Sequence, residues 1–413
     1  MVPPRWFPHS DIRNIALFYL ISACSGSFFC ASIWLFFFTK YISLGEVGIA
    51  DWGAVVAAWL AEVPSGILAD KFGRRRLIII AMVLSGVGIG LQGLACNWQT
   101  FLITNAIYLV GFSFYSGAGE ALAYESLRGC ADQEKAYEQV ISTARSIELG
   151  VSLVAVMAGA YLYQFAPSLP FFVQGFCFCA GGVFAFLASE TVILQPGSGQ
   201  SVVGSPRQLL SESFRLIDRR LLPVALICVS ALGLYDLICW SFLRTAIATK
   251  FGFGEIGYAV IINIGIVSVI FATRMIPLLR ARLGDRFGFP GFALLLGLSV
   301  SLCAVDFGYH GAALLIIMIL LGNIVKPWMS IIANAAAADS NRATLISLFG
   351  FATRIQFLLL GAILPYLAEQ GFFNHTVITL GGVAMIGAVL SWLIWSEQAP
   401  ACARSAVAEQ KLA

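Results

Sequence analysis

Apolar runs long enough to cross a lipid bilayer recur along almost the whole chain, and they restrict its possible folds more than any other feature. Hydrophobic residues make up 59% of the 413 residues, and charged residues make up only 11%. A soluble domain has about 25% charged residues, so water is not the solvent of this chain. A spanning helix needs about 20 apolar residues, and runs of this length cross lipid as helices. The sequence therefore predicts an all-α membrane protein.

About twelve such runs are separated by polar breaks. They lie at residues 12–38, 46–68, 77–96, 99–126, 143–165, 168–189, 221–245, 255–279, 289–306, 311–337, 344–366 and 373–396. An even number of spans places both termini on the same side of the membrane.

The basic residues are distributed unequally between the two sides that this count defines. Only Lys40, Arg244 and Lys250 fall on the side opposite to the termini, and Lys326 and Arg354 fall within spans. The rest of the 25 Lys and Arg lie on the side of the termini. Because Lys and Arg accumulate in cytoplasmic loops, we expect both termini in the cytoplasm. We expect a multi-pass protein of the cell's inner (plasma) membrane.

A polar stretch divides the spans into two sets of six. The sequence QPGSGQSVVGSP at 195–206 is typical of a flexible linker. The following RQLLSESFRLIDRRLL is either an amphipathic helix on the inner leaflet or an extension of the next span. The predicted domains are an N-terminal six-helix bundle at 1–190, a cytoplasmic linker with an amphipathic helix at 191–220, a C-terminal six-helix bundle at 221–398 and a cytoplasmic tail at 399–413.

Two short sequence repeats indicate that the bundles are related. LADKFG at 68–73 returns as LGDRFG at 283–288, and GEVG at 45–48 returns as GEIG at 254–257. The first pair follows the second and eighth spans, and the second pair precedes them. Two matches at nearly the same offset favour a duplicated six-helix unit.

The stretch EVPSGILADKFGRRR at 62–76 ends an apolar run with an aspartate and a group of cations. Its residues Gly66, Asp70, Gly73 and Arg74 fit the pattern G-x-x-x-D-[RK]-x-G-[RK]-[RK]. This pattern resembles the loop-2/3 signature of the major facilitator superfamily, whose members are secondary transporters of twelve helices in two six-helix bundles. With the repeat and the long central loop, the resemblance covers essentially the whole chain.

The resemblance implies a gating role for this motif. Glycines let a neighbouring helix approach closely. Asp70 lies at a helix end, where it can pair with Arg74 and with the positive N-terminus of the eleventh helix, near residues 340–344. Such a contact closes the cytoplasmic side and opens when the two bundles rock. The alternative is that these charges only fix the orientation of the chain in the membrane.

Acidic residues within spans are candidates for proton coupling. Glu62 lies eight residues before Asp70, about 12 Å deeper in the membrane. A buried carboxylate is costly unless it is paired or protonated, so Glu62 is either a proton carrier or part of a fixed interhelical contact. Glu120 shares a helix face with Tyr124, and the resemblance implies that the fourth helix lines the central cavity. Glu125 is expected to be a solvated or capping charge near the inner surface.

Charges also lie deep in the second set of spans. Asp236 and Lys326 can form a pair that exchanges partners during transport, bind a charged substrate, or serve packing alone. Trp240, Trp328 and Arg354 are further candidates for lining a substrate cavity, with Tyr124 and Lys326. Asp236 joins Glu62 and Glu120 as a proton-coupling candidate.

Nearer the membrane surface, Arg145 and Glu148 open the fifth span three residues apart. For these two a local ion pair is favoured over a gating role.

The sequence favours secondary transport over other functions. It contains no GxxxxGK[ST] loop for ATP, no basic aromatic surface for nucleic acid, and no cluster of nucleophile and base that would indicate an enzyme. The cysteines are single apolar residues, and we expect no metal or cofactor. We predict proton-coupled efflux of a small organic solute by alternating access, and we expect the protein to be a monomer in the bilayer.

Two departures from the family's antiporters leave the direction of transport open. The GPxxGG signature is absent from the fifth helix, and the fourth helix lacks the arginine often seen in drug/proton antiporters. Proton-coupled uptake of a metabolite is the alternative. A transporter-like membrane sensor without flux is the alternative class.

Overall fold

The computed structural model describes residues 9–127, 132–189, 221–336 and 342–410. It does not describe the side chains of residues 9–12, 63–67, 69–72, 116–117, 336, 342–344, 346 and 397–410. The predicted linker and amphipathic helix at 191–220 lie outside the described residues. The chain forms two compact units, one of residues 1–200 with 255–263 and one of residues 201–254 with 264–413.

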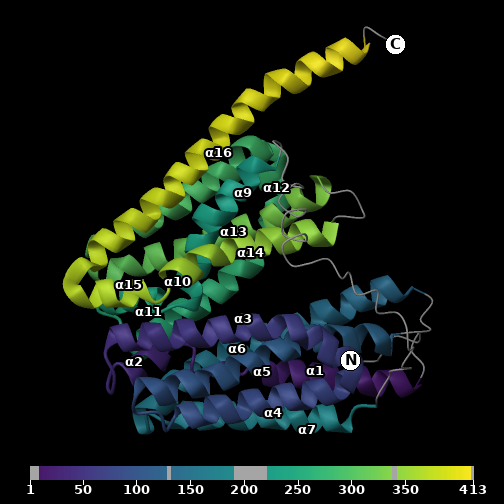
Figure 1. Cartoon of the computed structure of the whole chain (residues 1–413), viewed down its shortest axis with the longest axis vertical. Coiled ribbons are helices and arrows are strands. Elements are labelled where there is room, and N and C mark those ends of the chain that lie inside the picture. Colours follow the sequence, from purple (N-terminus) through teal and green to yellow (C-terminus); the bar gives the residue numbers. More distant parts are fainter. Residues whose placement is uncertain (1–8, 128–131, 190–220, 337–341, 411–413) are drawn as a thin grey trace. The chain divides into compact units, whose positions relative to one another are not determined.

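The first unit is a bundle of long helices (Figure 1). Its elements are α1 (His9–Ser25), α2 (Trp34–Phe38), α3 (Leu44–Phe72), α4 (Arg74–Gln92), α5 (Trp98–Ser126), α6 (Gln133–Phe165) and α7 (Leu169–Leu187). Helix α4 packs against α5 and α7, and α3 packs against α5.

The second unit contains more interrupted helices. Its elements are α9 (Leu222–Ile227), η1 (Cys228–Leu232), α10 (Gly233–Trp240), α11 (Leu243–Lys250), α12 (Glu255–Leu302), η2 (Gly308–Gly311), α13 (Ala312–Ala336), α14 (Arg342–Leu360), α15 (Ile363–Leu367), η3 (Ala368–Phe372) and α16 (Phe373–Gln410). The first residues of α12 group with the first unit.

These elements give the predicted all-α membrane fold of about twelve spanning helices. Within the described residues, nine helices are long and apolar enough to cross a membrane. One of them, α12, has 48 residues and is divided by Gly284, whose φ of 66° is not helical. A shorter apolar helix, Ser347–Leu360, lies within α14, and α1 covers part of the first predicted span.

The first span is not the continuous helix predicted over 12–38. Helix α1 ends at Ser25, and turns lead to α2 at Trp34. A Cβ on Gly26 would lie 2.6 Å from the carbonyl oxygen of Glu148 in α6. The freed N–H of Cys30 donates to Gln174 of α7 at 2.9 Å. Close contact with α6 and a side-chain acceptor from α7 therefore replace the regular helix here.

Small residues set the spacing of the helices in the first unit. A Cβ on Gly86 of α4 would lie 2.7 Å from the carbonyl oxygen of Gly175 in α7. A Cβ on Gly111 of α5 would lie 2.5 Å from Ser85 Oγ of α4. Helices in lipid associate by such close packing, so these glycines fix the α4–α5 and α4–α7 contacts.

The two predicted repeats occupy corresponding helix ends. Ser43 and Glu46 form a capping box at the start of α3, with the Ser43 N–H donating to Glu46 Oε2 at 3.0 Å. Helix α12 begins at Glu255, inside the second copy of this sequence. In the longer repeat, Gly73 (φ 86°) separates α3 from α4, whereas Gly284 (φ 66°) divides α12. Both copies thus place a left-handed glycine between successive spans, although at different positions of the motif.

Candidate transport site

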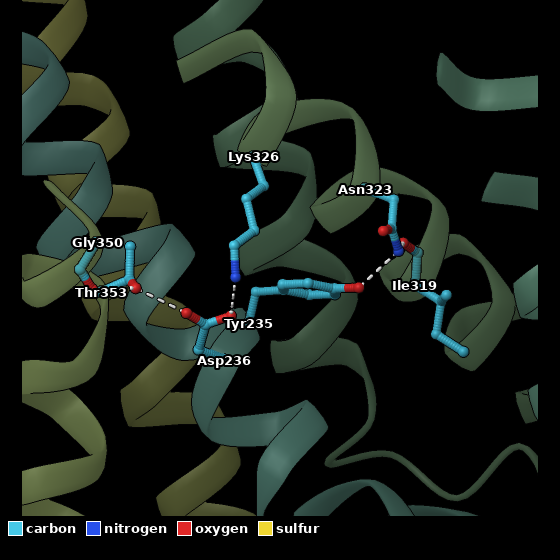
Figure 2. A network of polar contacts seen from close by, with 7 residues as sticks. All are labelled: Tyr235, Asp236, Ile319, Asn323, Lys326, Gly350 and Thr353. Atoms are coloured by element: carbon cyan, nitrogen blue, oxygen red, sulfur yellow. Dashed lines mark hydrogen bonds and ion pairs between the residues drawn. The ribbon is translucent and has the colours of Figure 1, made fainter. Parts of the chain in front are cut away.

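The second unit encloses an ion pair between Asp236 of α10 and Lys326 of α13 (Figure 2). Lys326 Nζ lies 2.8 Å from Asp236 Oδ1, and the hydroxyl of Thr353 on α14 donates to Asp236 Oδ2 at 2.7 Å. Asp236 is 9% exposed, whereas the side chain of Lys326 is 48% exposed. The two residues thus form an ion pair, which was one of the predicted alternatives, and its role in transport stays a prediction. Three helices thus meet at one carboxylate, and the cation that neutralises it remains accessible.

An irregular helix holds Asp236 in place. The π-helical segment η1 precedes α10, and Ser241 ends α10 in an extended conformation. Gln356 Nε2 of α14 donates to the carbonyl oxygens of Val229 and Ser230 at 2.7 and 2.8 Å. A wider turn displaces carbonyls from their regular helical partners, and π segments are frequent at functional sites. The seventh span is therefore one helix with a π-helical segment, Leu222–Trp240, and it ends before the end of the stretch predicted over 221–245.

Tyr235, next to Asp236, joins α10 to α13 by a second contact. Asn323 Nδ2 donates to Tyr235 Oη at 2.6 Å (Figure 2). A Cβ on Gly322 would lie 2.1 Å from the Tyr235 ring, so only glycine leaves room for this ring. Pro327 has no N–H and leaves the carbonyl of Asn323 without its usual helical donor. Two adjacent residues of α10 are thus bound to α13 beside its proline.

Trp328 has a different place from the one predicted. It is fully buried, and its Nε1 donates to Asp285 Oδ1 at 2.7 Å. The ring packs against Phe289, and a Cβ on Gly288 would lie 2.3 Å from it. The expectation that Trp328 lines a substrate cavity is not supported, because its ring is enclosed by packing and its N–H is bonded inside the second unit. Trp328 thus contacts Asp285 and Gly288 of LGDRFG at 283–288, the second copy of the repeat.

Asp285 corresponds to Asp70 in this second copy, at the connection between two spans. Arg280 binds it through two parallel hydrogen bonds of 2.7 Å, from Nε to Oδ1 and from Nη2 to Oδ2. These bonds, helped by the Trp328 N–H, hold the pKa of the Asp285 carboxyl below its ordinary value although partial burial opposes them. The motif aspartate of the second unit is therefore fixed within its own unit.

In the first unit, the described part of the motif makes a buried ion pair. Arg74 Nη1 lies 3.1 Å from Glu125 Oε1, and Glu125 is 8% exposed. Glu125 is therefore not a solvated charge, one of its two predicted roles, because the start of α4 brings Arg74 to the end of α5. Arg75 donates to the carbonyl oxygen of Phe186 and lies over its ring. Gly66 and the side chain of Asp70 lie outside the described side chains, so the latch stays a prediction.

The other acidic candidates of the first unit lie at its surface. Glu62 of α3 and Glu120 of α5 are exposed in this unit, and Glu62 takes part in further contacts. Tyr124 is also exposed, and its ring meets that of Tyr137 on α6 edge to face, with centroids 5.2 Å apart. Glu120 and Tyr124 therefore share an exposed face, as the helical spacing predicts, and their part in transport stays a prediction.

The remaining predicted residues differ in their exposure to solvent. Trp240 ends α10 and is 66% exposed. Arg354 follows Thr353 on α14, is partly buried and has interactions with neighbouring groups. The expected local pair of Arg145 and Glu148 is confirmed, with 2.7 Å between Nη1 and Oε2.

Thr353 and Gln356 were missed by sequence reasoning. They lie three residues apart on one face of α14, and both bond to the irregular seventh span. An uncharged polar residue in an apolar run is a weak signal by itself. Their spacing beside Arg354 was the available clue.

Comparisons with known proteins identify the family and the fold. The sequence profile described as Major Facilitator Superfamily matches residues 15–326. A comparison with curated protein sequences finds no significant match.

Solved structures of transporters share the fold. A mutant form of the nucleoside transporter NupG has a TM-score of 0.73 and 13% identity, over 94% of this chain and 100% of that one. The POT family transporter PepTSo has a TM-score of 0.72 and 14% identity, over 95% and 99% of the two chains. A bacterial homologue of the human lysosomal transporter Spinster, inward-facing and unoccupied, has a TM-score of 0.67 and 14% identity, over 94% and 96%. With most of its length inside the family profile, this chain belongs to the Major Facilitator Superfamily and is a multi-pass membrane protein of the secondary transporter class.

Proposed function

We propose that this protein exports a small organic solute in exchange for protons, by alternating access of its two six-helix bundles. The observation that carries the proposal is the ion pair of Asp236 and Lys326, at which a half-exposed amine neutralises a buried carboxylate. A buried pair of this kind is stable only while both charges are matched. A proton or a charged solute that replaces one partner therefore leaves the other partner's charge unmatched.

The charges of this site suggest the class of solute. A zwitterionic solute has an ammonium group that competes with a proton and with Lys326 for Asp236, and a carboxylate that Lys326 can bind. Competition between solute and proton for one carboxylate is the requirement of an antiporter. Export driven by inward proton flow follows from this competition.

Uptake is the second candidate, and a different substrate charge favours it. A purely anionic solute binds Lys326 best once Asp236 is protonated, so solute and proton then bind together. The absence of the GPxxGG signature from α6 also favours this candidate. The two directions thus differ in the sign of the coupling between proton and solute.

The motif of the first unit supplies the proposed gate. Gly73 turns the chain sharply after α3, and Arg74 is fixed on Glu125 at the start of α4. This places Asp70 on the last turn of α3, three residues before that turn. We assign it the role of a latch that closes the cytoplasmic side, with both termini in the cytoplasm of the inner membrane.

Flux across liposomes tests the proposed function. The purified protein is reconstituted with an imposed pH difference, and labelled zwitterionic, anionic and cationic organic solutes are offered one class at a time. Export by exchange requires that the solute moves in the direction opposite to the proton flow. The compartment that receives the solute should then become more alkaline, because it supplies the protons. Movement of solute with the proton identifies uptake instead, and binding without flux in any class identifies a sensor and overturns the proposal.

Two further variants test the carriers predicted in the first unit. Glu62→Gln and Glu120→Gln are each expected to impair proton-driven flux, because each removes a titratable group from a span. Exchange of labelled solute without a pH gradient serves as the control for folding and binding. Wild-type pH dependence in both variants would remove them from the coupling mechanism.

A further inference from the structure

Asp51 is an acidic residue inside a membrane-spanning helix that the site described above does not use. It lies seven residues after α3 begins at Leu44, about 10 Å along the helix. It is partly buried, and none of the ion pairs found among the described residues includes it. A carboxylate in such a position is normally paired, and one without a cation marks a functional site by default.

The only hydrogen-bond partner of Asp51 among the described residues is an amide. Asn105 Nδ2 of α5 donates to Asp51 Oδ1 at 3.1 Å. Gln92 Nε2 of α4 donates in turn to Asn105 Oδ1 at 3.2 Å. Both amides are buried, so donors from two helices form a short chain that ends at one oxygen of the carboxyl group. The other oxygen, Oδ2, accepts no hydrogen bond from the described residues.

The cations of these helices lie far from Asp51, since Lys71 of α3 is twenty residues further on, about 30 Å along the helix, and α5 contains no Lys or Arg. The acidic groups are also distant. On α3, Glu46 caps the helix through Ser43, and Glu62 lies eleven residues further on. On α5, Glu120 and Glu125 lie fifteen and twenty residues beyond Asn105, about 22 and 30 Å along the helix. The nearest titratable group on α5 is Tyr108, whose hydroxyl faces Gln174 of α7.

The cations of α4 are also remote. They stand at its first turn, whereas Gln92 is its last residue.

Two opposing effects therefore set the protonation of Asp51. Its low-dielectric surroundings favour the neutral acid, and the amide donor favours the anion. Asp236 differs, because a cation and a hydroxyl both lie within hydrogen-bond distance of its carboxylate. A group that changes its charge during transport needs an environment in which neither form is strongly preferred.

We propose that Asp51 is a proton-binding site of this transporter, reached from the membrane face at which α3 and α5 begin. A hydronium ion of the adjoining water transfers its proton to Oδ2, so one O–H bond of hydronium breaks as the Oδ2–H bond forms, and the reverse transfer to water ionises the carboxyl group again. That face is about 10 Å away along α3, whereas the far end of the helix at Phe72 is about 31 Å away. The proposal rests on the proposed proton coupling for its role in transport, but the titration of Asp51 stands apart from it.

Infrared difference spectra of the reconstituted protein, recorded across a pH titration, test the site directly. The wild type is expected to show a protonated-carboxyl band that Asp51→Asn removes and that Glu46→Gln, on the same helix, leaves unchanged. Asn105→Leu keeps the carboxyl group and removes its donor, so the midpoint of this band is expected to move to higher pH by about one unit. Gln92→Leu is expected to cause a smaller shift in the same direction.

The results separate a proton site from a structural contact. If Asp51→Asn removes no band, or if Asn105→Leu leaves every midpoint in place, the proposal is overturned. If Asp51→Asn does not fold, the Asn105→Leu shift alone decides. Wild-type flux that does not depend on pH would contradict the proposed proton coupling, while the infrared band would still decide whether Asp51 binds a proton.

The side of access has its own test. In oriented liposomes, acidifying the face at which α3 begins should produce the Asp51 band faster than acidifying the other face. Equal rates, or the opposite order, would overturn that part of the proposal.

Discussion

Asp236 shows how single residues define the chemistry of this transporter. Its two carboxylate oxygens are used by different helices, Oδ1 by Lys326 of α13 and Oδ2 by Thr353 of α14. Hydrogen bonds to an ionised group are about twice as strong as neutral ones. The carboxylate is therefore fixed in position by two helices, and a competitor for Lys326 or Thr353 would release it.

Removing the two partners of this ion pair should have unequal effects. Lys326→Met leaves Asp236 buried without a cation and is expected to destabilise the protein by about 3 kcal/mol. Asp236→Asn leaves a half-exposed ammonium group that water can solvate, so a smaller loss is expected. The double variant should recover part of the stability that Lys326→Met loses. Thermal unfolding in detergent measures all three, and additive losses in the double variant would show that the two residues do not interact.

Sequence reasoning identified the charged residues of the site better than the neutral ones. A charge in an apolar run is conspicuous, so Asp236 and Lys326 were found, and they form the ion pair that was one of the predicted alternatives. Asp51 was overlooked because it lies near the start of a span, where a charge attracts little notice. Trp328 was misplaced because nearness in sequence to Lys326 says nothing about which side of α13 a side chain occupies.

Irregular helices determine where these residues lie. The lengths of the apolar runs locate the spans, because each spanning helix needs about 20 apolar residues. They do not locate the π-helical segment η1 or the interruption after α1, because both depend on contacts with other helices. The boundaries that sequence reasoning missed are thus those where a side chain from elsewhere, such as Gln356 or Gln174, binds the backbone.

Gln356→Leu tests the support of the seventh span. The change removes two hydrogen bonds to backbone carbonyls of η1 and is expected to cost about 1–3 kcal/mol. The side-chain oxygen of Gln356 has no partner among the described residues, so its loss partly offsets the effect. Gln133→Leu, at the first residue of α6, is the control. Equal melting temperatures for the two variants in detergent would contradict this role of Gln356.

Gly284 should be required for the division of α12. Its φ of 66° strains any residue with a Cβ, although the space around it is open. Gly284→Ala is therefore expected to destabilise the protein by about 1–2 kcal/mol. Gly291→Ala, also in open space on α12 but in a helical conformation, is expected to be neutral or stabilising. The comparison fails if both variants have the same melting temperature.

The whole molecule is a secondary transporter of the Major Facilitator Superfamily, built from two compact helical units. The count of spans and the repeats predicted the duplicated helical membrane fold, because such units leave strong patterns, and the resemblance of the motif at 62–76 to the family signature indicated the family. The solute that a given carboxylate binds leaves no such pattern in the sequence. The identity of the solute is therefore a matter for flux measurements.

The orientation of the chain in the membrane is a prediction from its basic residues, and reporter fusions can test it. A fluorescent protein fused after residue 206 should fluoresce, because that linker is expected in the cytoplasm. Alkaline phosphatase fused after residue 253 should be active, because Lys250 is expected on the opposite side. Exchanging the two reporters provides the control, and the reversed pattern would contradict the assigned orientation.

Alternating access is the central claim, and distances between the two units measured by electron spin resonance test it most directly. One spin-label pair at Arg76 and Arg282 reports on the membrane side of the two motif copies, and another at Gln99 and Val305 reports on the opposite side. With a transported solute or a change of pH, one distance should lengthen while the other shortens. Distances that stay fixed, or that change in the same direction, would contradict the account.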